Sequence, residues 1–406
     1  MSLEAAAIHI AEQITRHEYV EVIAHHDADG IAAGSILCHA MFRAGIRFRL
    51  RIRREIAAAD LTNGQAYLLC DLGSGSEDLP RDTMVVDHHQ PHFTGEYHAN
   101  PRLFGIDGDS ELSASGTAYL VARNLGDNRD LVGLALLGIM GDHQPLIGRN
   151  LEIFNEGVGN GIINPNRGLR LAGRDMYERW FVSINPYLDG ISGDENAVSA
   201  IIAQVTEKDS VRLDLLMSLS ILQVIPHADA SCIEEIYGDT YALEREVIPD
   251  AHALASVIDA CGKSGQGDLG ASLCLRSSRD AGAAWEVAHA HRLNVIAAIR
   301  TAAGTFSGQD SLFETGDPTV ASDLADALAC QSARQSPIAV VARDGEICRI
   351  SARCPPTLDR DLGSVLRMLA QSCGGTGGGH RHRAGATIPC TRIEMFRKGW
   401  QEAVLA

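Results

Sequence analysis

The sequence predicts an α/β protein: an N-terminal domain with a parallel sheet, a helical connector and a smaller C-terminal α/β domain, with a cleft between the two lobes. Three observations predict this class. Strand-like and helical runs alternate over the first 145 residues, helix-like segments dominate the middle, and a hairpin pattern appears near the C-terminus. Strands separated by helices form βαβ units and a mainly parallel sheet. We therefore expect domains at residues 1–150, 151–250 and 251–406.

The elements of the N-terminal domain follow from local hydrophobic patterns. Arg47–Arg53 alternates strictly, with Phe48, Leu50 and Ile52 on one face and arginines on the other, as in a half-buried strand. The other runs indicate an amphipathic helix, a strand, a helix, two short strands and a helix, at residues 1–17, 19–24, 31–42, 66–70, 83–86 and 131–141. Ligands of parallel sheets collect beyond the carboxyl ends of the strands, so the residues after these strands are candidates for a site.

The C-terminal domain mixes helical and strand patterns. Helices are expected at residues 251–260, 321–333 and 362–372, and strands at residues 271–275, 338–342 and 347–352. The Asp344-Gly345 pair separates the last two strands, which is a strong signal for a hairpin.

The composition is that of a globular protein in a reducing compartment. The chain has 406 residues, of which 45% are hydrophobic, and its 10 cysteines form no CxxC pair, which argues against a zinc ribbon or a thioredoxin site. No apolar run approaches the roughly 20 residues of a membrane helix. The N-terminus lacks the basic region and apolar core of a signal peptide. We expect a cytoplasmic protein that does not contact a membrane.

Charge is distributed unevenly along the chain. The net charge of −17 argues weakly against a protein that coats nucleic acid through bulk charge. Residues 43–54 nevertheless contain six arginines and no acid, and residues 349–398 are rich in arginine and histidine. Two such basic strips could guide a phosphodiester chain, or they could simply be solvated faces.

Four short motifs combine aspartate with glycine or histidine, each directly after a predicted strand or helix. They are His25-His26-Asp27-Ala28-Asp29-Gly30, Asp71-Leu72-Gly73-Ser74-Gly75, Asp87-His88-His89 and Asp142-His143. A single aspartate at such a position usually caps a turn or a helix. Four together, three of them at strand ends of one sheet, indicate a ligand site.

The residue types in these motifs suit divalent cations. Carboxylates with imidazoles favour Mn²⁺, Fe²⁺ or Zn²⁺, and sites dominated by carboxylates favour Mn²⁺ or Mg²⁺. Asp27 and Asp29 stand two residues apart and could reach different ions, while a third carboxylate could bridge ions about 3.5–4 Å apart. The chain has neither a P-loop lysine motif nor a GxSxG elbow, which argues against an NTPase or a serine hydrolase.

The order HDADG, DLGSG, VVDHH and then GD on a helix resembles the DHH phosphoesterase family. The run GGTGGGH near the C-terminus is similar to the GGGH signature of the C-terminal domain associated with that family. The combination resembles the archaeal RecJ-like branch of single-strand exonucleases. The resemblance implies a catalytic DHH domain at residues 1–150 and a substrate-binding domain at residues 251–406.

The resemblance also implies two divalent ions, Mn²⁺ before Mg²⁺, and a role for each matching residue. Asp27 and Asp71 would hold one ion, with His25 as a further ligand or a support for one. The residues for the other ion would be Asp29, Asp71, His88 and Asp142, with Asp71 bridging the two. His89 would contact the scissile phosphate or orient the site, and Asp87 would brace a histidine.

The C-terminal signature implies a phosphate-binding surface. Its expected residues are Ser351, Arg353, Gly377, Gly378, Gly379, His380 and Arg383. The glycines would let backbone amides approach a phosphate, and Arg353 in a Ser-x-Arg strand suits bidentate phosphate binding. Arg383 departs from the family, whose members usually carry alanine there; this cation would strengthen backbone binding or narrow the pocket. Upstream, Ser113-Ala114-Ser115-Gly116 opens a predicted helix whose N-terminus could accept a phosphate, although plain capping by serine is an equal reading.

We therefore expect a metal-dependent phosphodiesterase, foremost a RecJ-like exonuclease that hydrolyses single-stranded DNA or RNA by a two-metal mechanism without a covalent intermediate. One alternative keeps the site and takes short oligoribonucleotides or cyclic dinucleotides, which the acidic charge and the 5% aromatic content would suit. Another class is a replisome-associated scaffold, because the eukaryotic replication-helicase scaffold resembles this family without its metal ligands. Replisome proteins are accordingly possible partners. His289 and His291, two residues apart, are expected to be surface residues.

Overall fold

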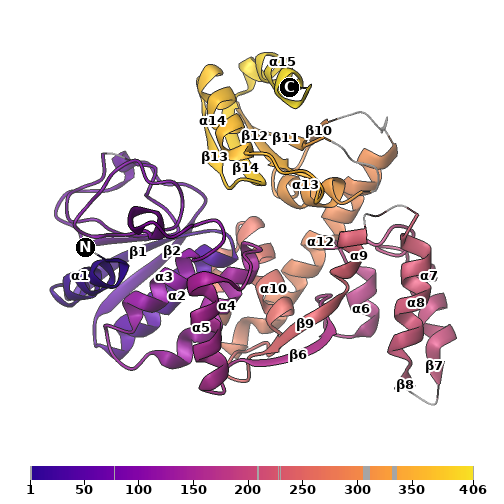
Figure 1. Cartoon of the computed structure of the whole chain (residues 1–406), viewed down its shortest axis with the longest axis horizontal. Helices are drawn as coiled ribbons and strands as arrows, with labels where there is room; N and C mark the ends of the chain where they lie inside the picture. The colour runs from indigo at the N-terminus through magenta and orange to yellow at the C-terminus, as the bar shows by residue number, and fades with distance from the viewer. Residues whose placement is uncertain are drawn as a thin grey trace. The chain divides into compact units, whose positions relative to one another are not determined.

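The computed structural model describes residues 2–76, 78–207, 210–226, 228, 230–304, 311–331 and 336–405 (Figure 1). The chain forms two compact units, each built from two segments: residues 1–167 with 239–288, and residues 168–238 with 289–406. The chain passes from one unit to the other within β6 (Asn164–Leu169), β9 (Tyr237–Ala242) and α12 (Ala281–Gly304). The expected domain boundaries at residues 150 and 250 stay a prediction.

The first unit is built on a five-stranded parallel sheet in the order β2-β1-β3-β4-β5. Its strands are β1 (Tyr19–His25), β2 (Arg47–Arg53), β3 (Tyr67–Cys70), β4 (Met84–Val86) and β5 (His98–Ala99). Strands β3 and β4 are buried along their whole length, in keeping with their apolar sequences YLLC and MVV. The predicted α/β class with a parallel sheet is confirmed.

Seven α-helices lie in the described part of this unit. They are α1 (Leu3–Thr15), α2 (Ala28–Arg43), α3 (Ala114–Ala122), α4 (Val132–Gly141), α5 (Gly148–Gly159), α10 (Ala251–Lys263) and α11 (Gly267–Cys274). Short 3-10 turns occur at Ala58–Asp60, Pro101–Phe104, Arg129–Leu131 and Ser278–Asp280. Helix α2 is buried along most of its length and packs on β1, α3 and α4. Gly34 makes this packing possible, because a Cβ atom there would lie 2.8 Å from the Ala24 Cβ.

The second unit ends in a mixed five-stranded sheet, in the order β10-β11-β12-β14-β13 (Figure 1). Its strands are β10 (Leu312–Thr315), β11 (Ile338–Asp344), β12 (Ile347–Arg353), β13 (Thr376–Gly379) and β14 (Arg383–Pro389). Helices α14 (Leu362–Ser372) and α15 (Ile393–Leu405), the latter following a 3-10 turn at Cys390–Arg392, share one apolar core with the sheet, and α12 and α13 (Ala321–Ala329) share another. The predicted hairpin at Asp344-Gly345 joins β11 and β12.

The rest of the second unit is mainly helical. Its elements are α6 (Met176–Phe181), α7 (Glu195–Val205), β7 (Thr206–Glu207), β8 (Ser210–Val211), α8 (Leu213–Val224) and α9 (Ala230–Glu234). Leu188, Val198 and Leu216 are among the buried residues of an apolar core around Trp180. No helix in the described ranges is long and apolar enough to cross a membrane.

Two local predictions were wrong and one falls partly outside the described residues. The run 271–275 forms the end of helix α11 and its C-cap, Leu275, rather than a strand, because an apolar run this short has no periodicity that separates the two. His291 is only 4% exposed, with its Nε2 2.8 Å from Asp323 Oδ2, because α12 packs against α13. The helix expected at 321–333 ends at Ala329 as α13, and residues 332–335 lie outside the described residues.

Candidate metal centre

The first motif links β1 to α2. His25 is the last residue of β1, and Asp27 caps α2 by accepting a hydrogen bond of 2.9 Å from the Gly30 amide. His25 Nδ1 lies 2.8 Å from Asp27 Oδ2. Gly30 is required by this tight turn, since a Cβ atom there would lie 2.5 Å from the His25 Cβ.

Asp71 lies between two groups of potential ligands. It follows β3 with φ at 60°, a left-handed conformation that aspartate tolerates better than most residues. Its Oδ2 is 3.1 Å from His25 Nδ1, and its Oδ1 is 3.2 Å from His88 Nε2. Each carboxylate oxygen of Asp71 therefore faces a different histidine.

His88 is the centre of the second group. Its Nε2 lies 3.2 Å from Asp142 Oδ2, at the end of α4, and 3.8 Å from Asp29 Oδ2. Its Nδ1 lies 2.6 Å from the Gly108 carbonyl oxygen. A ring nitrogen so close to a carbonyl donates its proton, so Nε2 is the atom that faces the carboxylates; it would offer its lone pair to a bound ion after losing its own proton, as in metal-binding histidines.

Asp29 is held at the start of α3 by two backbone amides. The amides of Ala114 and Ser115 donate to its carboxylate at 2.8 and 2.9 Å. These donors are two of those that could have bound a phosphate, and Ser113 caps the helix through the Gly116 amide at 3.0 Å, so the capping reading holds. Gly138 of α4 leaves room for Asp29, because a Cβ atom there would lie 2.0 Å from Asp29 Oδ1.

Asp87 holds the DHH segment, Asp87-His88-His89, in place through hydrogen bonds. It is buried, and its carboxylate accepts bonds from the Ser74 amide at 2.9 Å and from the His88 amide at 2.8 Å. His89 Nδ1 lies 2.8 Å from Asp87 Oδ1. Burial alone would raise the pKa of Asp87, but the charge of His89 and its hydrogen bond hold that pKa well below its usual value.

Burial and neighbouring charges shift the pKa values of Asp29 and His88 in the second group. Burial, with the negative charges of Asp142 and Asp71, raises the pKa of the Asp29 carboxyl to about 8. Burial alone would lower the pKa of His88, but its contacts with Asp142 and Asp71 raise that pKa well above its usual value. Protons thus occupy positions that a divalent ion would take when it binds.

The positions of the carboxylate and imidazole groups in this cluster also fit divalent ions. Asp71 Oδ1 is buried and accepts no hydrogen bond from the residues that the structure describes. In the first unit, three sets of side chains have ligand atoms close enough together to share an ion: His25 with Asp27 and Asp71, Asp29 with His88 and Asp142, and Asp71 with Asp87 and His89. Carboxylates combined with imidazole nitrogens are the donors that Mn²⁺ accepts, so these residues are metal-binding candidates.

Several residues that hold the site histidines in place were not identified by the sequence analysis. The Asn100 amide group donates to the His89 carbonyl at 2.8 Å, and Arg102 Nε donates to the His88 carbonyl at 2.8 Å. Gln144 Nε2 donates to the Gly108 carbonyl at 2.9 Å, and Asn150 in turn donates to Gln144 Oε1 at 2.8 Å. These bonds join residues 6 to 36 positions apart, so no local pattern in the sequence marked them.

The predicted phosphate-binding residues lie together on the last sheet. Ser351 of β12 and Gly378 of β13 are both in register with Gly385 of the strand between them, and Arg353 is in register with Arg383. Gly377 and Gly379 have a packing role, because Cβ atoms there would lie 2.7 Å from the Leu366 carbonyl oxygen and 2.8 Å from the Ala384 Cα. Gly378 has no such crowding, and His380 donates its backbone amide to the Arg383 carbonyl at 2.7 Å.

Asp326 is a further residue that sequence reasoning missed. Its Oδ1 lies 2.7 Å from Arg353 Nε and also pairs with Arg383. Similar pairs occur elsewhere in the second basic strip, where Arg381 Nε and His382 Nε2 lie 2.6 and 2.8 Å from Asp359 Oδ1. Much of the positive charge of this strip is therefore compensated within the protein.

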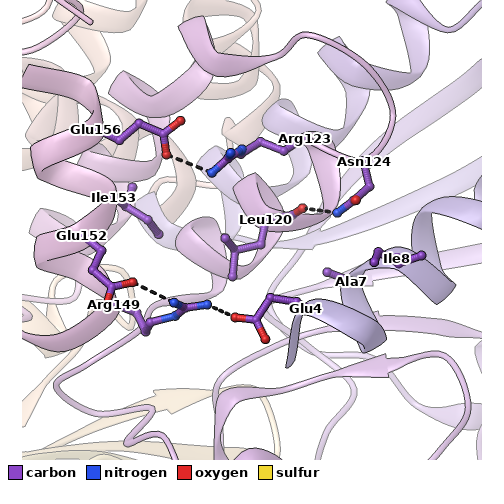
Figure 2. A pocket seen from close by; sticks show the side chains of 10 residues that line it. All are labelled: Glu4, Ala7, Ile8, Leu120, Arg123, Asn124, Arg149, Glu152, Ile153 and Glu156. Carbon is purple, nitrogen blue, oxygen red and sulfur yellow. Dashed lines mark hydrogen bonds and ion pairs between the residues drawn. The ribbon is translucent and has the colours of Figure 1, made fainter. Parts of the chain in front are cut away.

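A surface pocket of about 400 Å³ lies away from these motifs. Its lining comes from α1, α3 and α5, and three ion pairs, Arg123–Glu156, Arg149–Glu152 and Arg149–Glu4, cross or border it (Figure 2). None of the predicted site residues lines it. Its internally compensated charges give no reason to place phosphodiester chemistry there.

Comparison with known proteins identifies the C-terminal part of the chain. Residues 311–404 match the DHHA1 domain family. An uncharacterized protein of Methanocaldococcus jannaschii is 28% identical over 429 residues, which span 97% of this chain and 95% of that protein.

Solved structures with a similar fold include RecJ and CDC45. RecJ in complex with Mn²⁺ from Thermus thermophilus matches with a TM-score of 0.63 and 17% identity over 99% of this chain and 54% of that one, so this chain spans about half its length. A structure of exonuclease RecJ bound to manganese matches with a TM-score of 0.58 and 16% identity over 100% of this chain and 94% of that one. CDC45 from Entamoeba histolytica matches with a TM-score of 0.62 and 11% identity over 98% of this chain and 97% of that one. Residues 311–404 thus match a DHHA1 domain and the chain has the fold of RecJ, in agreement with the DHH-family resemblance of its motifs; its placement in the archaeal branch stays a prediction.

Proposed function

We propose that this RecJ-like protein is a metal-dependent phosphodiesterase that removes nucleotides from the end of single-stranded DNA or RNA. The observation that carries the proposal is the position of Asp71, whose two oxygens lie 3.1 Å from His25 Nδ1 and 3.2 Å from His88 Nε2. One carboxylate shared by two ligand groups is the arrangement that a two-ion site needs.

Each ligand group would hold one ion. The first would be held by Asp27 and Asp71, with His25 as a further ligand or a support, and the second by Asp29, Asp71, His88 and Asp142. Such ions, when bound, activate a water molecule and neutralise charge on the phosphate. Hydrogen bonds with the α3 amides and the Gly108 carbonyl fix the positions of Asp29 and His88. These ligands would therefore need no reorientation during the reaction.

His89 is the residue of this cluster that we assign to the scissile phosphate. Its side chain is 35% exposed, whereas those of His88 and Asp71 are almost completely buried. Asp87 holds the Nδ1 side of the ring, so Nε2 is the atom that can reach a substrate. On the C-terminal sheet, we assign phosphate binding to Ser351, Arg353 and the glycine signature.

Two other functions predict different results in the same assay. A phosphodiesterase for short oligoribonucleotides or cyclic dinucleotides would use the same metal ligands with a smaller substrate. A replisome-associated scaffold would not need them, and the likeness to the CDC45 fold is compatible with that role. The buried carboxylates favour catalysis, since the repulsion among them without an ion costs stability.

The test is cleavage of end-labelled oligonucleotides, from dinucleotides to long single strands, with Mn²⁺ and with Mg²⁺. Asp71→Asn is the matched control, because asparagine keeps the shape of the side chain and tolerates the left-handed backbone. We expect stepwise shortening of long strands, reduced more than about 100-fold in the variant.

The result also separates the alternatives. Cleavage confined to the shortest oligomers would replace the exonuclease by a small-nucleotide phosphodiesterase. Cleavage of no substrate by the metal-loaded protein would contradict an enzymatic role and favour the scaffold.

A further inference from the structure

Strand β2 carries a row of arginines that the metal centre does not use. We call Arg47, Arg49, Arg51 and Arg53 the arginine row. The residues between them pack inward: a Cβ atom on Gly34 of α2 would lie 3.2 Å from Leu50 Cδ1, and one on Gly267 of α11 would lie 2.5 Å from Ile52 Cγ2. Because alternate residues of a strand point to opposite faces, the arginines project from the face of the sheet opposite these two helices.

The arginine row leads to the metal centre. Strands β1 and β2 are parallel, and Arg53 is in register with His25, the histidine that contacts Asp27 and Asp71. Register partners of neighbouring strands point to the same face, so His25 lies on the face that carries the row. At a rise of about 3.3 Å per residue, the row is about 20 Å long and ends beside His25.

The row keeps a surplus of positive charge. Glu18 Oε2 lies 3.6 Å from Arg47, and Glu21 Oε2 lies 3.2 Å from Arg51. Arg49 and Arg53 are exposed, and no described carboxylate lies within ion-pair distance of either. The row is thus a local cationic line on a chain whose net charge is −17.

We propose that the arginine row binds the phosphodiester backbone of a single strand and directs that strand to the metal centre. This inference rests on the proposed phosphodiesterase function. Guanidinium groups bind phosphate oxygens through charge-assisted hydrogen bonds, and backbone contacts of this kind do not depend on base sequence. A single line of cations matches one backbone, and its length favours a strand that extends several nucleotides from the metal centre over a dinucleotide.

Strand β2 lies at the edge of its sheet. Edge strands also carry charged residues because charge prevents pairing with the edge strand of a second molecule. That explanation predicts aggregation of charge-neutral variants and no change in the affinity for nucleic acid. The two explanations therefore differ in a binding measurement.

The experiment compares R49E/R53E and R49Q/R53Q with the wild type. The control R245E/R279E makes the same charge change at exposed arginines elsewhere in the first unit. Fluorescence anisotropy measures the affinity for labelled long single strands of DNA and of RNA, in chelator so that no cleavage occurs, over a range of salt concentrations. Circular dichroism and light scattering check folding and association.

We expect R49E/R53E to weaken the binding of both strands by at least about tenfold and to make the salt slope shallower by about 1.4, the value for two lost phosphate contacts on a single strand. R49Q/R53Q should lie between the wild type and R49E/R53E, and the control should stay within about twofold of the wild type. Unchanged affinity in R49E/R53E, an equal loss in the control, or a loss confined to DNA or RNA alone would overturn the proposal. The binding assay needs no cleavage, so the two proposals can fail separately. If the wild type cleaves no substrate but R49E/R53E binds single strands more weakly, the phosphodiesterase proposal is wrong and the arginine-row proposal stands. If the wild type cleaves single strands but R49E/R53E binds them as well as the wild type does, the arginine-row proposal is wrong and the phosphodiesterase proposal stands.

Discussion

Carboxylates converge on one another in the first unit, whereas one carboxylate holds two arginines in the second. Asp29, Asp71 and Asp142 surround His88, and the raised pKa of Asp29, at about 8, reflects burial and the repulsion among them. On the C-terminal sheet, Asp326 pairs with Arg353 and Arg383, which would otherwise repel each other across β12 and β14. The first arrangement concentrates negative charge around one histidine, while the second balances its charges within the protein and would have to exchange a partner to bind the proposed phosphate.

The largest expected effect concerns metal-dependent stability. Mn²⁺ at about 100 times its dissociation constant should stabilise the wild-type protein by about 2.7 kcal/mol, because the folded state alone presents the ligand cluster. Asp71→Asn should lose most of this gain, since it removes the carboxylate that faces both histidines. Thermal unfolding with and without Mn²⁺ measures the difference, and an equal gain in the variant would show that the cluster is not a metal centre.

The pH dependence of metal binding should be the next largest effect. Asp29, with its pKa raised to about 8, and His88, with its pKa well above the usual value, hold protons that an ion must displace. Affinity should therefore fall as pH falls from 8 to 6, by about tenfold per pH unit for each displaced proton.

The stability of the metal-free protein should move in the opposite direction. A carboxyl with a raised pKa favours the folded state at low pH and loses this contribution as pH rises from about 4, its unfolded value, towards 8. The lowered pKa of Asp87 acts only below pH of about 4, outside this window. Urea unfolding in chelator across this pH range measures the stability, and titration calorimetry with Mn²⁺ measures the affinity. A stability or an affinity that stayed flat with pH would contradict the corresponding statement.

The smallest expected effect is on the stability of the C-terminal sheet, where Asp326 pairs with two arginines. Arg383→Ala should cost less than about 1 kcal/mol of stability, because the pair is partly exposed and Arg353 keeps Asp326. Asp326→Ala should cost more, since it leaves two like charges directly opposite each other. Urea unfolding of both variants and of the double variant tests this: the double variant should be more stable than the sum of the two losses predicts. Additive losses would show that Asp326 does not hold the two arginines together.

Elements that depend on local pattern could be predicted from the amino-acid sequence alone. Strict alternation placed β2 at Arg47–Arg53, and helical periodicity placed α14 at Leu362–Ser372, with the bounds that the structure has. The convergence of the motifs could also be expected, because parallel strands bring the residues after their carboxyl ends to one edge of a sheet. Residues 271–275 show the limit of such patterns, since a short apolar run fits a buried helix as well as a strand.

The partners of the site residues follow from the packing of distant segments and could not be predicted from local pattern. Asp29 receives its hydrogen bonds from amides 85 and 86 positions away, and Asp326 pairs with Arg383 57 positions further on. His291 became a core residue through Asp323 on another helix. Such pairings depend on how helices and sheets pack, and packing brings together residues whose separation in sequence carries no periodic signal. The roles of the individual metal ligands remain predictions that the metal-binding experiments test directly.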